Sequence, residues 1–240
     1  MILLRDDICT IPISEVFEQT DGCPFCRMRN TVERQMVDYI LGAAMMEPDV
    51  RIKSNELGYC STHLAMMMNH KKRLPLALIL ETHLDSVKDD LFKKKLIRPS
   101  AKKQAYKAAR IEQTCFVCDR MEWGLERMLQ TVIRTYQEQL DFRGMFNAQQ
   151  YICLPHYEML MQAVEESPYK SKSAKLCDDA TNLCGNYLQS LRDDVHTFTQ
   201  MFDYRNSGEN SLLTDEQKEQ ASDSIERTFE YLTGTGCRTT

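Results

Sequence analysis

Cys23-Pro24-Phe25-Cys26 is followed by Cys60-Ser61-Thr62-His63, and the same arrangement returns as Cys115-Phe116-Val117-Cys118 and Cys153-Leu154-Pro155-His156. In each copy, 33 or 34 residues separate a C-x2-C pair from a C-x2-H pair. Each copy therefore offers three thiolates and one imidazole, the ligands of a closed tetrahedral zinc site. The sequence predicts two bound Zn²⁺ ions, one in each copy.

The spacing extends beyond the ligands and indicates an internal repeat. Cys60 and Cys153, His63 and His156, and Pro75 and Pro168 are all 93 residues apart, and three positions at one offset favour duplication of a whole unit. Only nine glycines and seven prolines occur, and the abundant Leu, Met, Glu, Lys and Gln favour helix. We predict an all-α fold with a first zinc-binding repeat at 1–97, a second at 98–205, and a loop and C-terminal helix packed on the repeats at 206–240.

Apolar residues recur at helical spacing in four segments, 28–43, 76–91, 121–140 and 177–202. Thr10 before Pro12 is typical of an earlier helix start. Segments 47–58 and 142–151 break the period, so we expect them to be irregular and to return the chain to each C-x2-H pair. Thr214 with Gln217 predicts a capping box for one last helix that ends at Gly234.

Two other chemistries fit part of this pattern. An iron-sulfur cluster can also take cysteine and histidine ligands, and Cys23-Pro24-Phe25-Cys26 resembles the redox pair of thioredoxin-like oxidoreductases. Those enzymes place the pair after a strand, and the sequence indicates none. Four protein ligands leave no position for a reacting water, and no phosphate loop or nucleophile elbow occurs. We therefore favour a non-enzymatic protein.

The remaining cysteines and His83 have simpler interpretations. Cys177 and Cys184 lie on an apolar helical stripe, where a free cysteine acts as a small hydrophobic residue. Cys9 and Cys237 also fall outside the two sets. His83 lies on an apolar stripe too, and we expect a hydrogen-bonded core histidine there, not a further metal ligand.

Charge is unevenly distributed along a chain whose formal net charge is −5. One stretch has basic residues and no acid: Lys93, Lys94, Lys95, Arg98, Lys102, Lys103, Lys107 and Arg110. A solvated linker is the expected structure, and a docking patch for nucleic acid or an acidic protein is the alternative. No apolar run reaches the length of a signal-peptide core or a membrane span. We expect a cytoplasmic protein without a membrane partner, whose thiols stay reduced.

With both sets identified, the chain resembles a bacterial family catalogued as domain of unknown function 6062. The resemblance covers nearly the whole chain and is carried by Gly22-Cys23-Pro24-Phe25-Cys26 and Gly58-Tyr59-Cys60-Ser61-Thr62-His63. The second copy departs from it, with Thr114 and Tyr151-Ile152 where the first copy has glycine. The resemblance implies a cytosolic protein of anaerobic Gram-positive bacteria, and it implies no established activity.

These observations predict a zinc-finger-like interaction or scaffold protein in which two structural zinc sites fix the ends of helices. We expect the partner to be another protein, and the sequence indicates no oligomeric state. The alternatives are a nucleic-acid-associated regulator that uses residues 93–110, and a thiol redox or metal-responsive switch.

Overall fold

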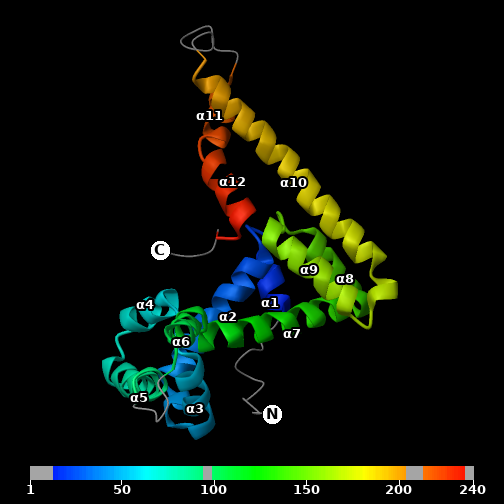
Figure 1. Cartoon of the computed structure of the whole chain (residues 1–240). Coiled ribbons are helices and arrows are strands. Elements are labelled where there is room, and N and C mark those ends of the chain that lie inside the picture. The colour runs from blue at the N-terminus through cyan, green and yellow to red at the C-terminus, as the bar shows by residue number, and fades with distance from the viewer. Residues whose placement is uncertain (1–12, 94–98, 204–212, 236–240) are drawn as a thin grey trace. The chain divides into compact units, whose positions relative to one another are not determined.

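A computed structural model describes residues 13–93, 99–203 and 213–235, and every regular element in these ranges is helical. The all-α prediction is confirmed for this part of the chain (Figure 1). The elements are α1 (Ile13–Glu18), α2 (Pro24–Ile40), η2 (Ala43–Met46), α3 (Pro48–Leu57), α4 (Ser61–Asn69), α5 (Arg73–Leu91), α6 (Ala101–Gln113), α7 (Phe116–Glu138), α8 (Leu140–Asn147), α9 (Leu154–Glu166), η3 (Lys170–Lys172), α10 (Ala174–Met201), α11 (Asp215–Ala221) and α12 (Ser224–Thr233).

The described residues form two compact units. Unit 1 takes the described part of Thr31–Leu125, and unit 2 takes that of Ile11–Asn30 and Glu126–Thr240. The boundaries fall inside α2 and α7, so each of these long helices begins in one unit and ends in the other. Each unit therefore combines segments from both halves of the sequence.

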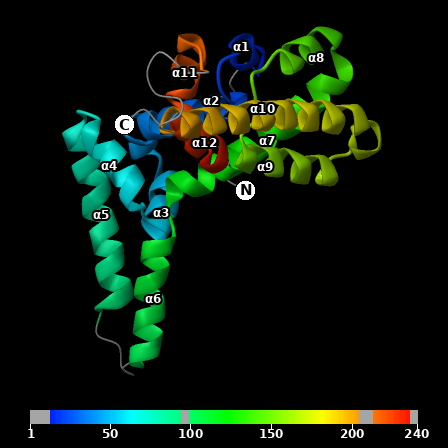
Figure 2. The same cartoon turned by 90° about the horizontal axis from the view of Figure 1, so that it is seen from above.

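Unit 1 is built from α3, α4, α5 and α6, together with most of α2 and the start of α7. Helix α5 packs against both α3 and α6, and α5 and α6 lie side by side (Figure 2). Ser100 caps α6 by accepting a hydrogen bond from the backbone N–H of Lys103 at 3.3 Å. No residue of α6 is buried. The core lies on the other helices and includes Val32, Met36, Ile40, Met67, Ile79, Phe116 and Val117.

Unit 2 has an aromatic core beside a long helical hairpin. The ring of Phe17 in α1 lies 4.9 Å from that of Phe142 and 5.9 Å from that of Phe146, both in α8. Helix α10 has 28 residues, and α11 and α12 fold back against it. The predicted apolar stripe over 177–202 is confirmed in part: Ala180, Cys184 and Leu191 are buried, whereas Phe202 is exposed.

The last segment begins and ends at the capping residues that the sequence predicts. Thr214 and Gln217 form the predicted capping box, and Gly234 ends α12 in the left-handed conformation with φ +67. The prediction of one continuous helix is wrong, because a turn at residues 222–223 separates α11 from α12.

Three segments predicted to be irregular contain helices. Segment 47–58 contains α3, and 142–151 contains most of α8. The loss of apolar periodicity at residue 47 marks a new helix and not a loop, because Pro48 occupies the first turn of α3 and Asp49 follows it, which is the composition of a helix start. Part of the predicted basic linker forms α6. The expected helix start at Thr10 and Pro12 lies outside the described residues.

The order of the helices recurs along the chain. A C-x2-C pair stands at the start of α2 and of α7, and a C-x2-H pair at the start of α4 and of α9. A short helix, α3 or α8, lies between the two pairs in each half. Duplication and the domain boundaries at 97/98 and 205/206 stay predictions.

Candidate metal centres

The eight predicted ligands meet in two groups of four. The unit 1 cluster consists of Cys60, His63, Cys115 and Cys118, and the unit 2 cluster consists of Cys23, Cys26, Cys153 and His156. In each cluster the Sγ atoms and one imidazole nitrogen all lie within 4.8 Å of one another. Each group has the composition and closeness to hold one metal ion.

The predicted grouping of these ligands is wrong. We expected each C-x2-C pair to close on the C-x2-H pair of its own copy, but each closes on that of the other copy. The physical reason is the helix that follows each C-x2-C pair. Helix α2 has 17 residues and so spans about 25 Å, which carries the chain away from Cys23 and Cys26. Segment 47–58 forms α3 and does not bring the chain back to them.

Both clusters are assembled from two helix starts. Cys60 is the N-cap of α4 and Cys153 that of α9, and neither side chain makes a capping hydrogen bond. Cys26 and Cys118 lie in the first turns of α2 and α7. A helix N-terminus carries partial positive charge and favours thiolate over thiol. Three thiolates can therefore gather around one cation at these positions.

The unit 2 cluster is closely packed. The Sγ atoms of Cys26 and Cys153 are 3.7 Å apart, and Nδ1 of His156 lies 3.0 Å from Cys153 Sγ, 3.4 Å from Cys26 Sγ and 3.7 Å from Cys23 Sγ. All four residues are buried. The backbone N–H of Gln150 donates to the carbonyl of Thr20 at 3.0 Å, which ties together the two segments that precede the ligands.

Arg27 fixes the loop ahead of Cys23. Its guanidinium donates to the carbonyl oxygens of Val16, Gln19 and Asp21, and to Oε1 of Gln149 at 2.7 Å. Gln149 in turn donates to the carbonyl of Phe17 at 2.8 Å. One side chain next to a ligand thus connects both halves of the unit 2 cluster.

Three tyrosines and the end of α12 lie near the unit 2 cluster. The rings of Tyr151 and Tyr187 stack with centroids 4.1 Å apart, and that of Tyr231 lies 5.6 Å from Tyr187. Burial raises the pKa of Tyr231 to about 12. The carbonyl oxygen of Gly234 accepts a hydrogen bond from Cys26 Sγ at 3.4 Å. The Gly234 contact places the end of α12 against the buried thiols of unit 2.

The unit 1 cluster has similar distances. Nδ1 of His63 lies 3.2 Å from Cys60 Sγ, 3.3 Å from Cys115 Sγ and 3.4 Å from Cys118 Sγ, and the sulfurs of Cys60 and Cys118 are 3.9 Å apart. His63 and Cys115 are buried, Cys60 is half-buried and Cys118 is exposed. Nε2 of His63 contacts the Glu33 carboxylate at 3.0 Å. Such a carboxylate orients a metal-binding histidine and increases its basicity.

Hydrogen bonds also join the two segments on which the unit 1 cluster is built. The backbone N–H of Phe116 donates to the carbonyl of Gly58 at 2.9 Å, and the hydroxyl of Thr114 donates to the carbonyl of Leu57 at 2.7 Å. Gly58 adopts φ +65, and an added Cβ would lie 2.9 Å from the His83 ring. Glycine is required there because the backbone is left-handed and the histidine occupies the space.

Protons are shared unequally within the clusters. Burial opposes ionisation of His63, but its contacts with Cys115 and Glu33 raise its pKa to about 10. Burial likewise raises the pKa of Cys115, yet the hydrogen bond with His63 lowers it overall. In unit 2, hydrogen bonds from Cys23 and Cys26 hold the pKa of Cys153 well below its usual value. A divalent cation would replace the remaining thiol protons and one proton of the His63 imidazolium, and would favour all the thiolates together.

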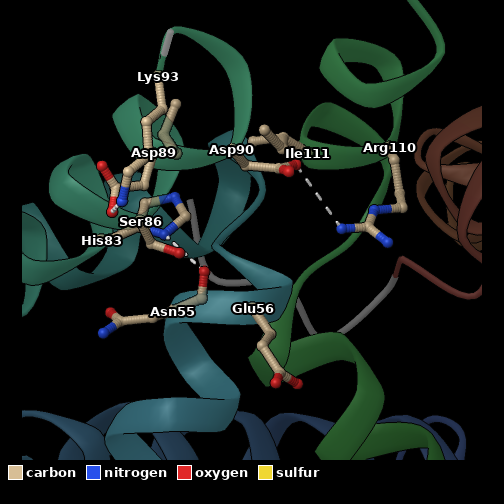
Figure 3. A pocket seen from close by; sticks show the side chains of 10 residues that line it. Asn55, Glu56, His83, Ser86, Asp89, Asp90, Lys93, Arg110 and Ile111 are labelled. Carbon is tan, nitrogen blue, oxygen red and sulfur yellow. Dashed lines mark hydrogen bonds and ion pairs between the residues drawn. The ribbon is translucent and has the colours of Figure 1, made fainter. Parts of the chain in front are cut away.

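His83 and the cysteines outside the two sets do not join either cluster. Nδ1 of His83 donates to the backbone carbonyl of Asn55 at 3.2 Å, which confirms the expected hydrogen bond (Figure 3), but His83 is half-buried beside a pocket and not in the core. Cys184 is buried and its thiol contacts the carbonyl of Ile152 at 3.3 Å, while Cys177 is half-buried. Cys9 and Cys237 lie outside the described residues.

A polar pocket of about 480 Å³ lies between α3, α5 and α6 in unit 1 (Figure 3). Lys93 contacts Asp89 at 3.2 Å, and Asp90 contacts both Lys107 and Arg110, the latter at 4.0 Å. Acidic side chains of α5 therefore neutralise part of the charge of the basic stretch.

Sequence reasoning missed Glu33, Arg27 and Gly234 as residues that support the clusters. Glu33 and Arg27 lie in an amphipathic helix, and nothing in the sequence distinguishes them from charged residues on its solvent-exposed face. Gly234 was predicted only as a helix end. Its contact with Cys26 joins residues 208 positions apart, and no local pattern encodes such a contact.

Among the described residues, no helix combines the length and the apolar character required to cross a membrane. Comparison with curated proteins and with solved structures found no match. A family model does match residues 4–238, nearly the whole sequence. The chain belongs to the family of unknown function DUF6062.

Proposed function

We propose that each cluster binds one Zn²⁺ ion through three thiolates and one imidazole, and that the protein is a non-enzymatic helical interaction protein stabilised by these ions. The observation that carries the proposal is the spacing of the ligand atoms. Zn–S bonds of about 2.3 Å and Zn–N bonds of about 2.0 Å put tetrahedral sulfurs about 3.8 Å apart, and sulfur and nitrogen about 3.5 Å apart. The corresponding distances here are 3.7 and 3.9 Å, and 3.0 to 3.7 Å.

The same distances favour a single ion over an iron-sulfur cluster. A cluster of two or four irons separates its cysteine ligands by more than one metal atom, whereas these ligand atoms all lie within 4.8 Å of one another. Three sulfurs and one nitrogen are also a typical structural zinc set. A brown protein containing iron and inorganic sulfide would contradict this choice of metal.

A structural role follows from the number of ligands and their positions. Four protein ligands fill a tetrahedral site, so no position remains for a substrate or a reacting water. In unit 1 the ion would join the starts of α4 and α7, and in unit 2 those of α2 and α9. Segments distant in sequence would thus be linked at two points, which offsets part of the entropy cost of closing long loops.

A protein partner has more support than nucleic acid. Lys93, Lys107 and Arg110 contact acids of α5, which reduces the basic field available to phosphates. Helix α12 exposes three large apolar residues at spacings of four and three, which is more typical of protein-binding surfaces: Ile225, Phe229 and Leu232. Retention on DNA that weakens steeply with salt would instead favour the nucleic-acid alternative.

Metal analysis of the purified chain tests the proposal. We expect two zinc atoms per chain, and a zinc X-ray absorption spectrum that fits three sulfurs and one nitrogen. Removal of zinc by a strong chelator should reduce the helical circular dichroism and lower the melting temperature. Cys177→Ser is the matched control, since it removes a thiol outside both clusters and should leave zinc content and melting unchanged. Unchanged helicity and melting after complete zinc removal would contradict a structural role.

A further inference from the structure

The two clusters differ in how far solvent reaches their sulfurs. All four ligands are buried in unit 2, whereas in unit 1 Cys118 is exposed and Cys60 is half-buried. Cysteine oxidation follows thiolate character and exposure. Because a zinc ligand is a thiolate by necessity, exposure is the property that distinguishes the two sets of sulfurs.

The two accessible sulfurs of unit 1 are also neighbours. Sγ of Cys60 and Sγ of Cys118 lie 3.9 Å apart, and they come from the starts of different helices, α4 and α7. The other two ligands, His63 and Cys115, are buried. An oxidant that reaches Cys118 therefore finds a second accessible thiolate beside it, which is the arrangement of an attacked cysteine with its resolving partner.

We propose that Cys118 is an oxidation site for hydroperoxides, and that its oxidation forms a Cys60–Cys118 disulfide and releases the unit 1 zinc while the unit 2 zinc stays bound. This inference rests on the proposed zinc binding and adds a regulatory role for one of the two sites. It assigns different roles to clusters with identical ligands: unit 2 keeps its metal, and unit 1 responds to oxidation.

The chemistry needs only the peroxide and two protons. The Cys118 thiolate attacks one peroxide oxygen, the O–O bond breaks, and protonation of the departing oxygen gives water and a sulfenic acid on Cys118. The Cys60 thiolate then attacks the sulfenic sulfur, an S–S bond forms, and hydroxide leaves and is protonated to a second water. Two sulfurs lose two electrons in total and the peroxide gains two. Zinc loses two of its four ligands and dissociates.

The experiment treats the zinc-loaded full-length chain with hydrogen peroxide in large excess over the protein and follows released zinc with a chromogenic chelator. We expect one zinc to be released at least tenfold faster than the other, and peptide mapping to find the Cys60–Cys118 disulfide. A thiol reductant with added zinc should restore both sites. Release of both ions at one rate, or a first disulfide between other cysteines, would overturn the inference.

The zinc content measured before oxidation distinguishes a failure of this inference from a failure of the proposed function. If the purified chain holds no zinc, zinc binding itself is wrong. If it holds two zincs and loses them together, zinc binding stands and only the oxidation site is wrong.

Cys118→His tests the role of the exposed sulfur without emptying the site. Two cysteines and two histidines still form a tetrahedral zinc set, and the variant removes the attacking thiolate. We expect it to hold two zincs and to release the unit 1 ion at least tenfold more slowly under peroxide. Cys177→Ser should release zinc as the unmodified chain does. Unchanged release from a Cys118→His chain that holds two zincs would contradict the assignment.

Discussion

The unit 1 cluster and the unit 2 cluster have the same ligands and the same construction from two helix starts, but their surroundings differ. All four residues of the unit 2 cluster are buried, and the end of α12 contacts Cys26. The unit 1 cluster leaves Cys118 exposed, and its histidine contacts Glu33. The two clusters show that one set of side chains can lie in two different surroundings, and the surroundings decide how far solvent reaches the sulfurs.

The largest expected effect concerns which cysteines share an ion. Cys26→Ser with Cys153→Ser removes two ligands from unit 2 and none from unit 1, so one zinc should resist a strong chelator. Cys26→Ser with Cys60→Ser removes one ligand from each cluster, so no zinc should resist it. Zinc analysis after chelation checks both chains. If each C-x2-C pair bound zinc with the C-x2-H pair of its own copy, the two results would be exchanged.

Loss of a single ligand should destabilise the two clusters to different extents, because one cluster is buried and the other is partly exposed. In Cys153→Ser no water can reach the empty position, and we expect the free energy of unfolding of unit 2 to fall by more than about 4 kcal/mol, as for loss of a metal. In Cys118→Ser, exposure lets water become the fourth ligand, so zinc should stay bound with a smaller loss of stability. Chemical unfolding with zinc analysis measures both. Equal losses would show that burial does not distinguish the clusters.

The sequence was sufficient to predict the helical class, the eight residues that gather in the two clusters and the ends of several helices. Cysteine and histidine spacing is a local signal, as is the capping box of Thr214 and Gln217, and both are set by residues within one or two turns. The grouping of the ligands is not local. It depends on where α2 and α7 carry the chain, and the motif reads the same whichever C-x2-H pair completes it.

The helices that we missed have a common physical cause. Segments 47–58 and 142–151 carry few apolar residues at helical spacing, because each of these short helices buries little: α3 buries Val50 and Ser54, and α8 buries Phe142 and Phe146. Periodicity detects a buried stripe, and two buried positions do not make one. Helix α6 buries none, so its basic residues were indistinguishable from those of a linker.

A smaller effect is expected from the carboxylate that contacts His63. Glu33→Gln keeps the size of the side chain but removes the negative charge 3.0 Å from Nε2. We expect zinc affinity to fall about 10-fold to 100-fold at the unit 1 cluster, with no change at the unit 2 cluster. Competition with a chelator of known affinity measures both sites. Glu56→Gln, an exposed acid of the same unit, is the control and should change neither affinity.

The smallest effect tests whether the end of α12 helps to enclose the unit 2 cluster. Gly234→Ala places a side chain at φ +67, and its Cβ would lie 3.4 Å from Cys153 Sγ. A left-handed alanine costs about 1–2 kcal/mol, so we expect a loss of that size in urea unfolding.

Gly185→Ala is the matched control for Gly234→Ala, because Gly185 is inside α10 and an added Cβ there meets no atom within 4 Å. It should stabilise the chain by about 0.5–1 kcal/mol. If Gly234→Ala also speeds zinc loss from unit 2 under chelation while zinc loss from unit 1 is unchanged, then α12 contributes to keeping the buried ion from water. If zinc loss from unit 2 is unchanged despite the lower stability, this helix end does not help to keep water from the cluster.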